Sequence, residues 1–164
     1  APLIGSAPGA IHLRSDVERK RMLGVEPLDR LPQQAYSEAQ SDAVYRRLCA
    51  RAEAALNAGR TVIVDAAFLG VRQRQWIEQV ATRTGTPFHG LWLVAPTEVL
   101  MERVANRRAD ASDADARVVA AQLASAYIAS NWRAIDASAD ADTVLDRARN
   151  ILHLDEDRHD CRGN

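Results

Sequence analysis

The segment Thr61-Val62-Ile63-Val64-Asp65 is the feature that most limits what this chain can fold into. Three consecutive β-branched apolar residues are typical of a short strand that is buried on both faces, as strands of a parallel sheet are. A helical pattern precedes the segment over about residues 38–58, and Gly59 supplies a stop for it. A second helical pattern follows over about residues 71–83. This alternation predicts an α/β fold with a mostly parallel sheet.

The same alternation continues through the rest of the chain. Further strands are predicted at residues 10–14, 88–94 and 132–136, and Pro96 marks the start of another helix. A last helix carries apolar residues between Val144 and Leu152. The sequence therefore predicts one α/β domain over residues 1–152 and a disordered, charged tail over residues 153–164.

Composition argues against several classes of protein. The 164 residues are 47% apolar, which is enough for one buried core. The 21 basic and 22 acidic side chains nearly cancel, so no overall field favours nucleic acid or an anionic membrane. Cys49 and Cys161 are far apart, without a histidine pair at zinc spacing. No apolar stretch approaches the ~20 residues of a membrane span. We expect a reduced, cytoplasmic protein without a membrane partner.

Asp65 is the first candidate for chemistry, because ligands of open parallel sheets bind beyond the carboxyl ends of the strands. In a phosphate-transferring enzyme, a carboxylate at such a strand end holds hydrated magnesium. The alternative is that Asp65 only caps the turn that follows the strand. The sequence favours the first interpretation and leaves the second open.

Asp16 is the second candidate, because it follows the strand predicted at residues 10–14. The segment Ser15-Asp16-Val17-Glu18 matches a capping box, which accounts for Ser15 and Glu18 without any catalytic role. A capping box does not account for Arg19, which shares a helical face with Asp16 and lies beside Arg14. A carboxylate flanked by guanidinium groups can orient an acceptor hydroxyl while the arginines hold an anionic part of the substrate.

A third candidate is the arginine cluster of Arg103, Arg107 and Arg108, followed by the small, polar segment 109–115. Arg103 and Arg107 share a helical face, and arginines before a moving loop can close over phosphates. They also suit the last turn of a helix, where the dipole favours cations, with Ser112 capping a new helix. Both interpretations stay open on the residues alone.

Three blocks of sequence together resemble a known family. The blocks are Arg14-Ser15-Asp16-Val17-Glu18-Arg19-Lys20, Val62-Ile63-Val64-Asp65-Ala66-Ala67-Phe68 and Arg107-Arg108-Ala109-Asp110-Ala111-Ser112-Asp113-Ala114-Asp115. In this order and spacing they resemble predicted P-loop kinases, the AAA-type ATP-binding proteins often fused behind an aminoglycoside-phosphotransferase-like domain. Polynucleotide kinase domains and zeta-toxin-like kinases belong to the same wider group. The resemblance covers all but the tail, and it implies a three-layer P-loop nucleoside-triphosphate-hydrolase-like fold.

The resemblance also implies an activity: transfer of phosphate from ATP, with Mg²⁺, to a hydroxyl of a small-molecule or nucleotide-like acceptor. Asp16 and Arg19 match a D-x-x-R motif whose aspartate contacts that hydroxyl, and Asp65 falls at the Walker B-like strand end, where it serves magnesium through water. The expected catalytic residues are Asp16, Asp65, Arg107 and Arg108; the expected acceptor-binding residues are Arg14, Arg19 and Arg74; and Arg103, Arg107 and Arg108 are expected to bind the cofactor. Residues 20–40 are expected to form a loop on the acceptor side.

One departure from the family is large. The family begins with a strand, a G-x-x-x-x-G-K-[ST] loop and a helix, and neither Gly5 nor Gly9 is followed by such a motif. We therefore expect that the chain starts about one βα unit late. The first strand is central in the family order 2-3-1-4-5, so its absence is expected to leave apolar strand edges. The prediction is an inactive kinase fragment, and the alternative is a non-catalytic pseudo-kinase module that binds a partner or regulates a fused domain.

Overall fold

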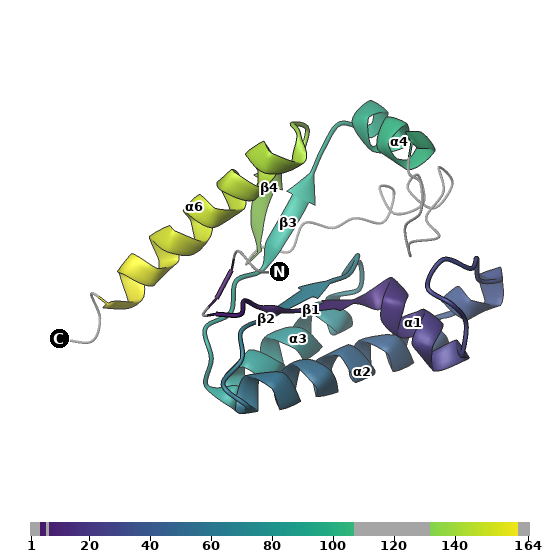
Figure 1. The fold of residues 1–164 in the computed structure, drawn as a ribbon, viewed down its shortest axis with the longest axis horizontal. Helices are drawn as coiled ribbons and strands as arrows, with labels where there is room; N and C mark the ends of the chain where they lie inside the picture. Colours follow the sequence, from purple (N-terminus) through teal and green to yellow (C-terminus); the bar gives the residue numbers. More distant parts are fainter. Residues whose placement is uncertain (1–3, 6, 107–131, 161–164) are drawn as a thin grey trace. The chain divides into compact units, whose positions relative to one another are not determined.

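The structure is a computed structural model that describes residues 4–5, 7–106 and 132–160, with side chains described as far as residue 152 (Figure 1). The contacts divide the chain into two compact units. The single domain over residues 1–152 stays a prediction. Among the described residues, the first unit runs as far as Phe88 and the second contains the residues from His89 onward. Each unit has its own parallel pair of strands and its own helices, so each is treated separately.

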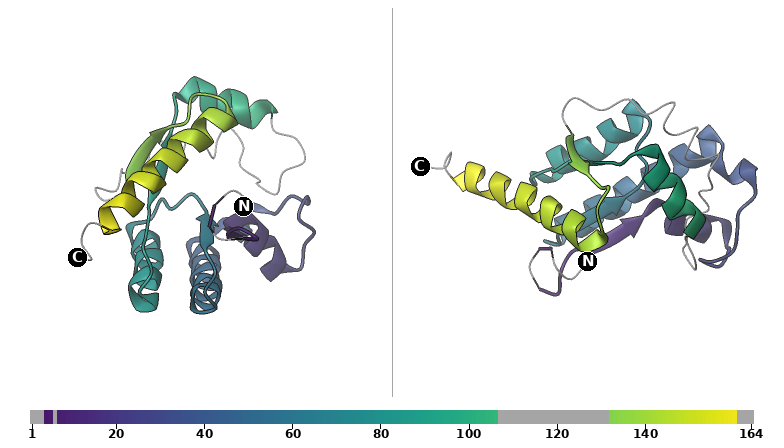
Figure 2. Two further views of the ribbon diagram at one scale, coloured as in Figure 1. Left: turned by 60° about the vertical axis from the view of Figure 1, so that its left-hand side comes forward. Right: turned by 90° about the horizontal axis from the view of Figure 1, so that it is seen from above.

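The first unit is built around helix α2. Its elements are β1 (Ile11–Arg14), α1 (Ser15–Leu23), the 3₁₀ helix η1 (Gln33–Tyr36), α2 (Glu38–Asn57), β2 (Val62–Asp65) and α3 (Val71–Thr84). Helix α2 packs against both strands, against α1 and against α3, and Figures 1 and 2 show it running alongside α3. Its inward stripe of apolar residues explains this central place. The buried core of the unit includes Leu13, Val44, Leu48, Ala52, Phe68, Ile77, Val80 and Ala81.

The second unit contains β3 (Leu91–Val94), α4 (Thr97–Asn106), β4 (Arg133–Asp136) and α6 (Ala141–Asp160). Strand β3 pairs in parallel with β4, and the rings of Trp92 and Trp132 meet edge to face with centroids 6.3 Å apart. Helix α6 continues through Asp160, although the sequence predicts disorder from residue 153. Every strand expected from the sequence is present, and β3 is the most shortened.

The burial of the strands differs from the prediction. Val62, Ile63 and Val64 were expected to be buried on both faces, but each is only half-buried, and Leu93 of β3 is 61% exposed. Within the described part of the chain, β2 pairs only with β1 and β3 only with β4. A two-stranded pair gives its strands fewer covering neighbours than a continuous sheet does, which explains the partial exposure. Among the described strands, β2 and β3 therefore have one strand neighbour each.

The start of α1 corrects the predicted capping box. Helix α1 begins at Ser15 itself, Arg14 occupies the N-cap position, and no side chain makes the cap hydrogen bond. Glu18 does not fold back to the helix start, because it is 2% exposed and pairs with Arg47 and Arg51 of α2. Two guanidinium groups compete more strongly for a carboxylate than one backbone N–H does. Glu18 therefore joins α1 to α2.

This ion cluster predicts an acid-sensitive contribution to stability. Burial alone would raise the pKa of the Glu18 carboxyl, but hydrogen bonds and charge from Arg47 and Arg51 outweigh it and hold the pKa below its usual value. A carboxyl with a lowered folded pKa stabilises the fold above its unfolded pKa, and the contribution is lost as the pH falls through the folded value. Between about pH 7 and about pH 3, the wild-type chain should therefore lose about 1 kcal/mol more unfolding free energy than Glu18→Gln. Urea unfolding at both pH values measures this difference, and equal losses would contradict it.

Candidate functional site

The carboxyl ends of β1 and β2 lie at one edge, because the strands are parallel and Arg14 is paired with Asp65. The Nε atom of Arg14 is 3.3 Å from Oδ2 of Asp65, and Nε2 of His12 is 3.5 Å from the same oxygen. The Asp65 side chain is 54% exposed. The carboxylate is therefore accessible to solvent while a guanidinium and an imidazole hold one of its oxygens.

A buried tyrosine connects this edge with Asp16. The hydroxyl of Tyr45, on α2, accepts a 2.9 Å hydrogen bond from the backbone N–H of Phe68. Burial raises the pKa of Tyr45 to about 12; the Phe68 hydrogen bond and the charge of Arg19 oppose the rise, whereas Asp16 and Asp65 add to it. Asp16, Arg19 and Asp65 thus all lie close enough to act electrostatically on one buried hydroxyl. These three predicted residues therefore all lie in the neighbourhood of Tyr45.

Sequence reasoning missed Tyr45. The signal was available, because Tyr45 lies beside Val44 on the apolar stripe of α2, with Leu48 one turn further on. A tyrosine on a buried stripe needs a partner for its hydroxyl, which marks it as a residue that positions other groups. Here the partner is the backbone of the turn after β2, so Tyr45 ties that turn to α2.

The turn after β2 is held in a strained conformation. Phe68 has a φ of 47°, in the left-handed region that bulky residues rarely adopt, and it is 4% exposed. The buried side chain of Arg74 donates from Nη1 to the carbonyl oxygens of Phe68 at 2.5 Å and Leu69 at 3.0 Å. The sequence predicts that Arg74 binds the acceptor. The structure places its guanidinium on the backbone of the turn, where it positions the segment that follows Asp65.

Arg19 is likewise engaged with the protein itself. It is 6% exposed, its Nη1 donates to the carbonyl of Ala35 at 2.7 Å, and its guanidinium stacks 4.7 Å from the ring centroid of Tyr36. Nε of Arg19 has no hydrogen-bond partner among the described residues. Lys20, also buried, donates to the carbonyl of Pro27 at 3.0 Å. Two cations of α1 therefore fasten the segment between α1 and α2, the expected acceptor-side loop.

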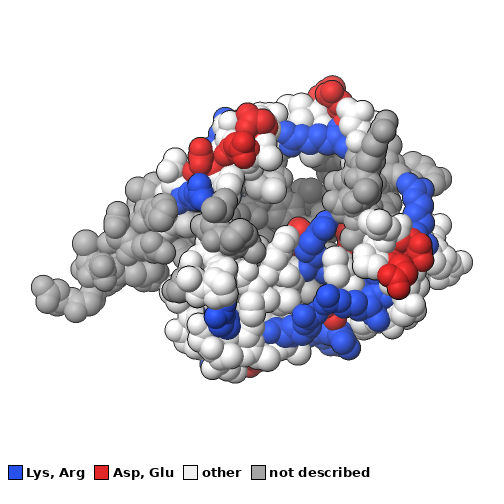
Figure 3. Space-filling view, in the orientation of Figure 1, with Lys and Arg blue, Asp and Glu red and all other residues white. Residues whose placement is uncertain are grey.

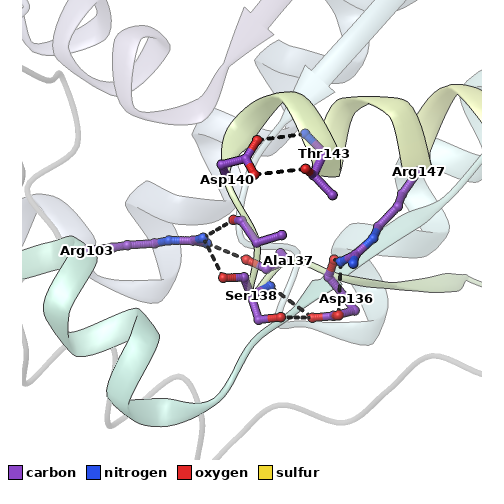
Figure 4. Close-up of polar contacts among 8 residues, drawn as sticks. Arg103, Asp136, Ala137, Ser138, Asp140, Thr143 and Arg147 are labelled. Atoms are coloured by element: carbon purple, nitrogen blue, oxygen red, sulfur yellow. Dashed lines mark hydrogen bonds and ion pairs between the residues drawn. The ribbon is translucent and has the colours of Figure 1, made fainter.

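Arg103, in the second unit, points at the turn after β4 (Figure 4). Its guanidinium donates to the carbonyl oxygens of Ala137 at 2.5 Å, Ser138 at 3.3 Å and Ala139 at 2.5 Å. A cofactor-binding role, as the sequence predicts, would require Arg103 to leave these carbonyls. Arg107 and Arg108 lie outside the described residues.

Asp136 at the end of β4 is a strand-end carboxylate that sequence reasoning did not single out. Its Oδ1 accepts hydrogen bonds from the backbone N–H and the hydroxyl of Ser138 at 2.9 and 2.6 Å, and Arg147 lies 3.0 Å from its Oδ2 (Figure 4). The Ser138 hydrogen bonds, followed by the charge of Arg147, lower the pKa of Asp136. One oxygen of Asp136 thus holds the turn after β4, and the other contacts Arg147 of α6.

The described residues also bear on direct metal binding and on insertion into a membrane. The described side chains, those of residues 4–5, 7–106 and 132–152, include no cluster of three or more histidines, cysteines, aspartates or glutamates that could bind a metal directly. None of the helices described is long and apolar enough to cross a membrane.

Parallel strand pairs with helices beside them, and an aspartate at the carboxyl end of β2, define a protein of the α/β class, in which ligands bind beyond the carboxyl ends of the strands. The model of a protein family described as an AAA domain matches residues 4–128. The chain belongs to this AAA domain family. A search of curated proteins found no match.

Proposed function

We propose that this chain is part of a kinase that transfers phosphate from ATP, with Mg²⁺, to a hydroxyl of a small-molecule or nucleotide-like acceptor. One observation carries the proposal: Asp65 ends β2 with an exposed carboxylate beside Arg14 at the end of β1, and Asp16 lies two residues beyond Arg14 in the first turn of α1. This is the edge where α/β sheets bind ligands. Membership of the AAA domain family supports a nucleotide as one of those ligands.

The geometry of Asp65 is compatible with a hydrated magnesium ion. Arg14 and His12 approach Oδ2 of Asp65, and Oδ1 has no recorded partner among the described residues. An exposed carboxylate oxygen can accept a hydrogen bond from a water of the Mg²⁺ shell, since this ion usually keeps several of its waters. The described residues include no glycine-rich cradle for the phosphates of ATP. Bound Mg-ATP would supply the phosphoryl group, and Asp65 would keep the ion at the strand end.

Asp16 is the proposed contact of the acceptor hydroxyl. It lies half-buried in the first turn of α1, where a carboxylate is favoured and can orient a hydroxyl and accept its proton. Arg14 would bind an anionic part of the acceptor. Arg19 and Arg74 would act through the backbone segments that they hold, and Arg107 or Arg108, with Arg103, would steady the charge of the transferred group. The proposal includes an aminoglycoside-phosphotransferase-like domain on the same polypeptide. It also places the protein in the cytoplasm.

A second candidate is a non-catalytic module that binds a partner or regulates a fused domain. It is favoured by the internal use of Arg19, Arg74 and Arg103, each of which donates to backbone carbonyls. This candidate predicts that substitution of Asp16 and Asp65 leaves all activity of the natural protein unchanged. The kinase proposal predicts that the same substitutions lower phosphate transfer by the natural protein.

Thermal unfolding with and without Mg-ATP tests the kinase proposal. It should be measured on the natural gene product that contains these residues, and in parallel on the chain alone. A ligand that binds only the folded state adds about 2.7 kcal/mol at a hundredfold excess over its Kd, so Mg-ATP should raise the unfolding temperature of the natural protein. Asp65→Asn should abolish the Mg²⁺ dependence of the shift, whereas Asp29→Asn, in an exposed loop, should not. No shift in the natural protein would favour the second candidate.

A further inference from the structure

A second cluster of charged residues lies between α1 and α2. Lys and Arg side chains gather over this part of the surface in Figure 3, with acidic atoms between them. Glu18 lies at the base of the cluster and is 2% exposed. Its Oε1 pairs with Nε of Arg47, its Oε2 pairs with Nη1 of Arg51, and Arg21 approaches Oε2 at 3.8 Å. We call these three arginines with Glu18 the basic cluster.

The charges of the basic cluster do not balance. Three guanidinium groups meet one carboxylate, which leaves an excess of two positive charges. The three arginine side chains remain 40–57% exposed, and Arg47 and Arg51 use one recorded N–H each on Glu18. A guanidinium has five N–H donors, so each of these arginines can also bind a second oxyanion. Like charges one helical turn apart repel, and a bound anion would relieve that repulsion.

The basic cluster borders a small pocket. Its volume is about 80 Å³, and His12, Arg14, Arg21 and Arg51 contribute cationic or hydrogen-bonding groups to its wall, which Glu18 also lines. Pockets for drug-sized ligands measure about 300–1,000 Å³, so this one suits a single small group rather than a whole nucleotide. The net charge of the chain is −1, so the attraction for an anion here is local and does not come from the protein as a whole.

Glu18 prepares the pocket for an anion, although it is itself an acid. Both of its oxygens are occupied by Arg47 and Arg51, so it orients their planar groups instead of facing the pocket as a free charge. Arginines whose geometry is set before binding lose less entropy when they bind a phosphate. The pocket residue Arg21 lies on the face of α1 that carries Glu18, and the proposed acceptor residue Asp16 lies on another face. Arg14, which precedes α1, borders both the pocket and Asp65.

We propose that this pocket binds the phosphate monoester group of a small phosphorylated molecule. A doubly charged tetrahedral oxyanion matches the small volume of the pocket and the forked donors of Arg21 and Arg51, and the positive excess of the adjoining basic cluster favours it. The ligand is held by its phosphate, and the rest of the molecule extends into solvent. The inference concerns binding alone and does not depend on phosphotransfer by the chain.

Titration with inorganic phosphate tests the site directly. Binding should be followed by isothermal calorimetry or by NMR shifts of α1 and α2 amides, at an ionic strength held constant with sodium chloride. We expect a Kd on the order of 1 mM for inorganic phosphate. Glycerol 3-phosphate, a monoester dianion, should bind comparably, and dimethyl phosphate, a singly charged diester, at least about tenfold more weakly. Equal affinities for the two esters, or no phosphate binding beyond that of chloride, would overturn the proposal.

Three arginine substitutions locate the binding. Arg51→Gln and Arg21→Gln should each weaken phosphate binding about tenfold, because each removes a charge-assisted hydrogen bond. Arg21 is 57% exposed and its contact with Glu18 is long, so the Arg21 variant keeps the test valid if the Arg51 variant unfolds. Arg46→Gln is the matched control, because Arg46 is on the same helix but stacks 5.1 Å from the ring of Trp76. The proposal fails if Arg46→Gln weakens binding as much as Arg21→Gln does.

Discussion

Asp16→Asn should lower the turnover number of the natural protein by about 10²–10⁴-fold, the usual contribution of a general base. Asparagine keeps the size and hydrogen-bonding reach of the side chain but cannot accept the proton of the acceptor hydroxyl. The fold should survive, because Asp16 is only half-buried and lies in the first turn of α1. Initial rates of ATP-dependent acceptor phosphorylation at saturating substrate measure the effect.

The control for this experiment is Asp29→Asn, which makes the same chemical change in an exposed part of the segment between α1 and α2. It should leave the turnover number unchanged. Circular dichroism should show both variants folded. If Asp16→Asn keeps the wild-type turnover number while the natural protein is an active kinase, Asp16 is not the acceptor contact and the base must be sought elsewhere.

Arg74→Met should lower the free energy of unfolding by about 3 kcal/mol. Arg74 is 3% exposed, and its Nη1 donates to two carbonyls of the turn that contains Phe68. Methionine fills much of the same space but leaves those carbonyls without their donor. Because Phe68 stays at a positive φ only while its surroundings hold it there, the loss of Arg74 also releases the turn. Urea unfolding gives the difference.

The matched control is Arg83→Met on the same helix. Arg83 makes an exposed ion pair with Glu53, at 2.8 Å, and its side chain is 50% exposed. Exposed pairs contribute little, so this variant should unfold much like the wild type. Arg74→Lys should recover part of the stability, since a lysine ammonium can reach one carbonyl. Similar losses from Arg74→Met and Arg83→Met would show that Arg74 does not hold the turn.

The positions of the strands could be read from the sequence, because short apolar runs such as Val62 to Val64 sit between helical patterns. The predicted parallel arrangement of the strands also implied that the residues at their carboxyl ends lie at one edge of the sheet. Arg14 and Asp65 meet there. The division into two units and the half-burial of β2 could not be read in this way, because periodicity shows which residues favour burial and not how many neighbours the fold supplies.

The same distinction between sequence and tertiary structure applies to the candidate site. The sequence by itself determined which residue types stand at the strand ends, because the apolar pattern that marks a strand is local. It singled out Asp16 and Asp65 in this way. Only the tertiary structure decided which partners the long charged side chains take. Arg19, Arg74 and Glu18 all find partners more than five residues away in sequence, on backbone carbonyls or on α2. Burial makes such partners obligatory, and a buried charge takes whichever partner the packing brings within reach.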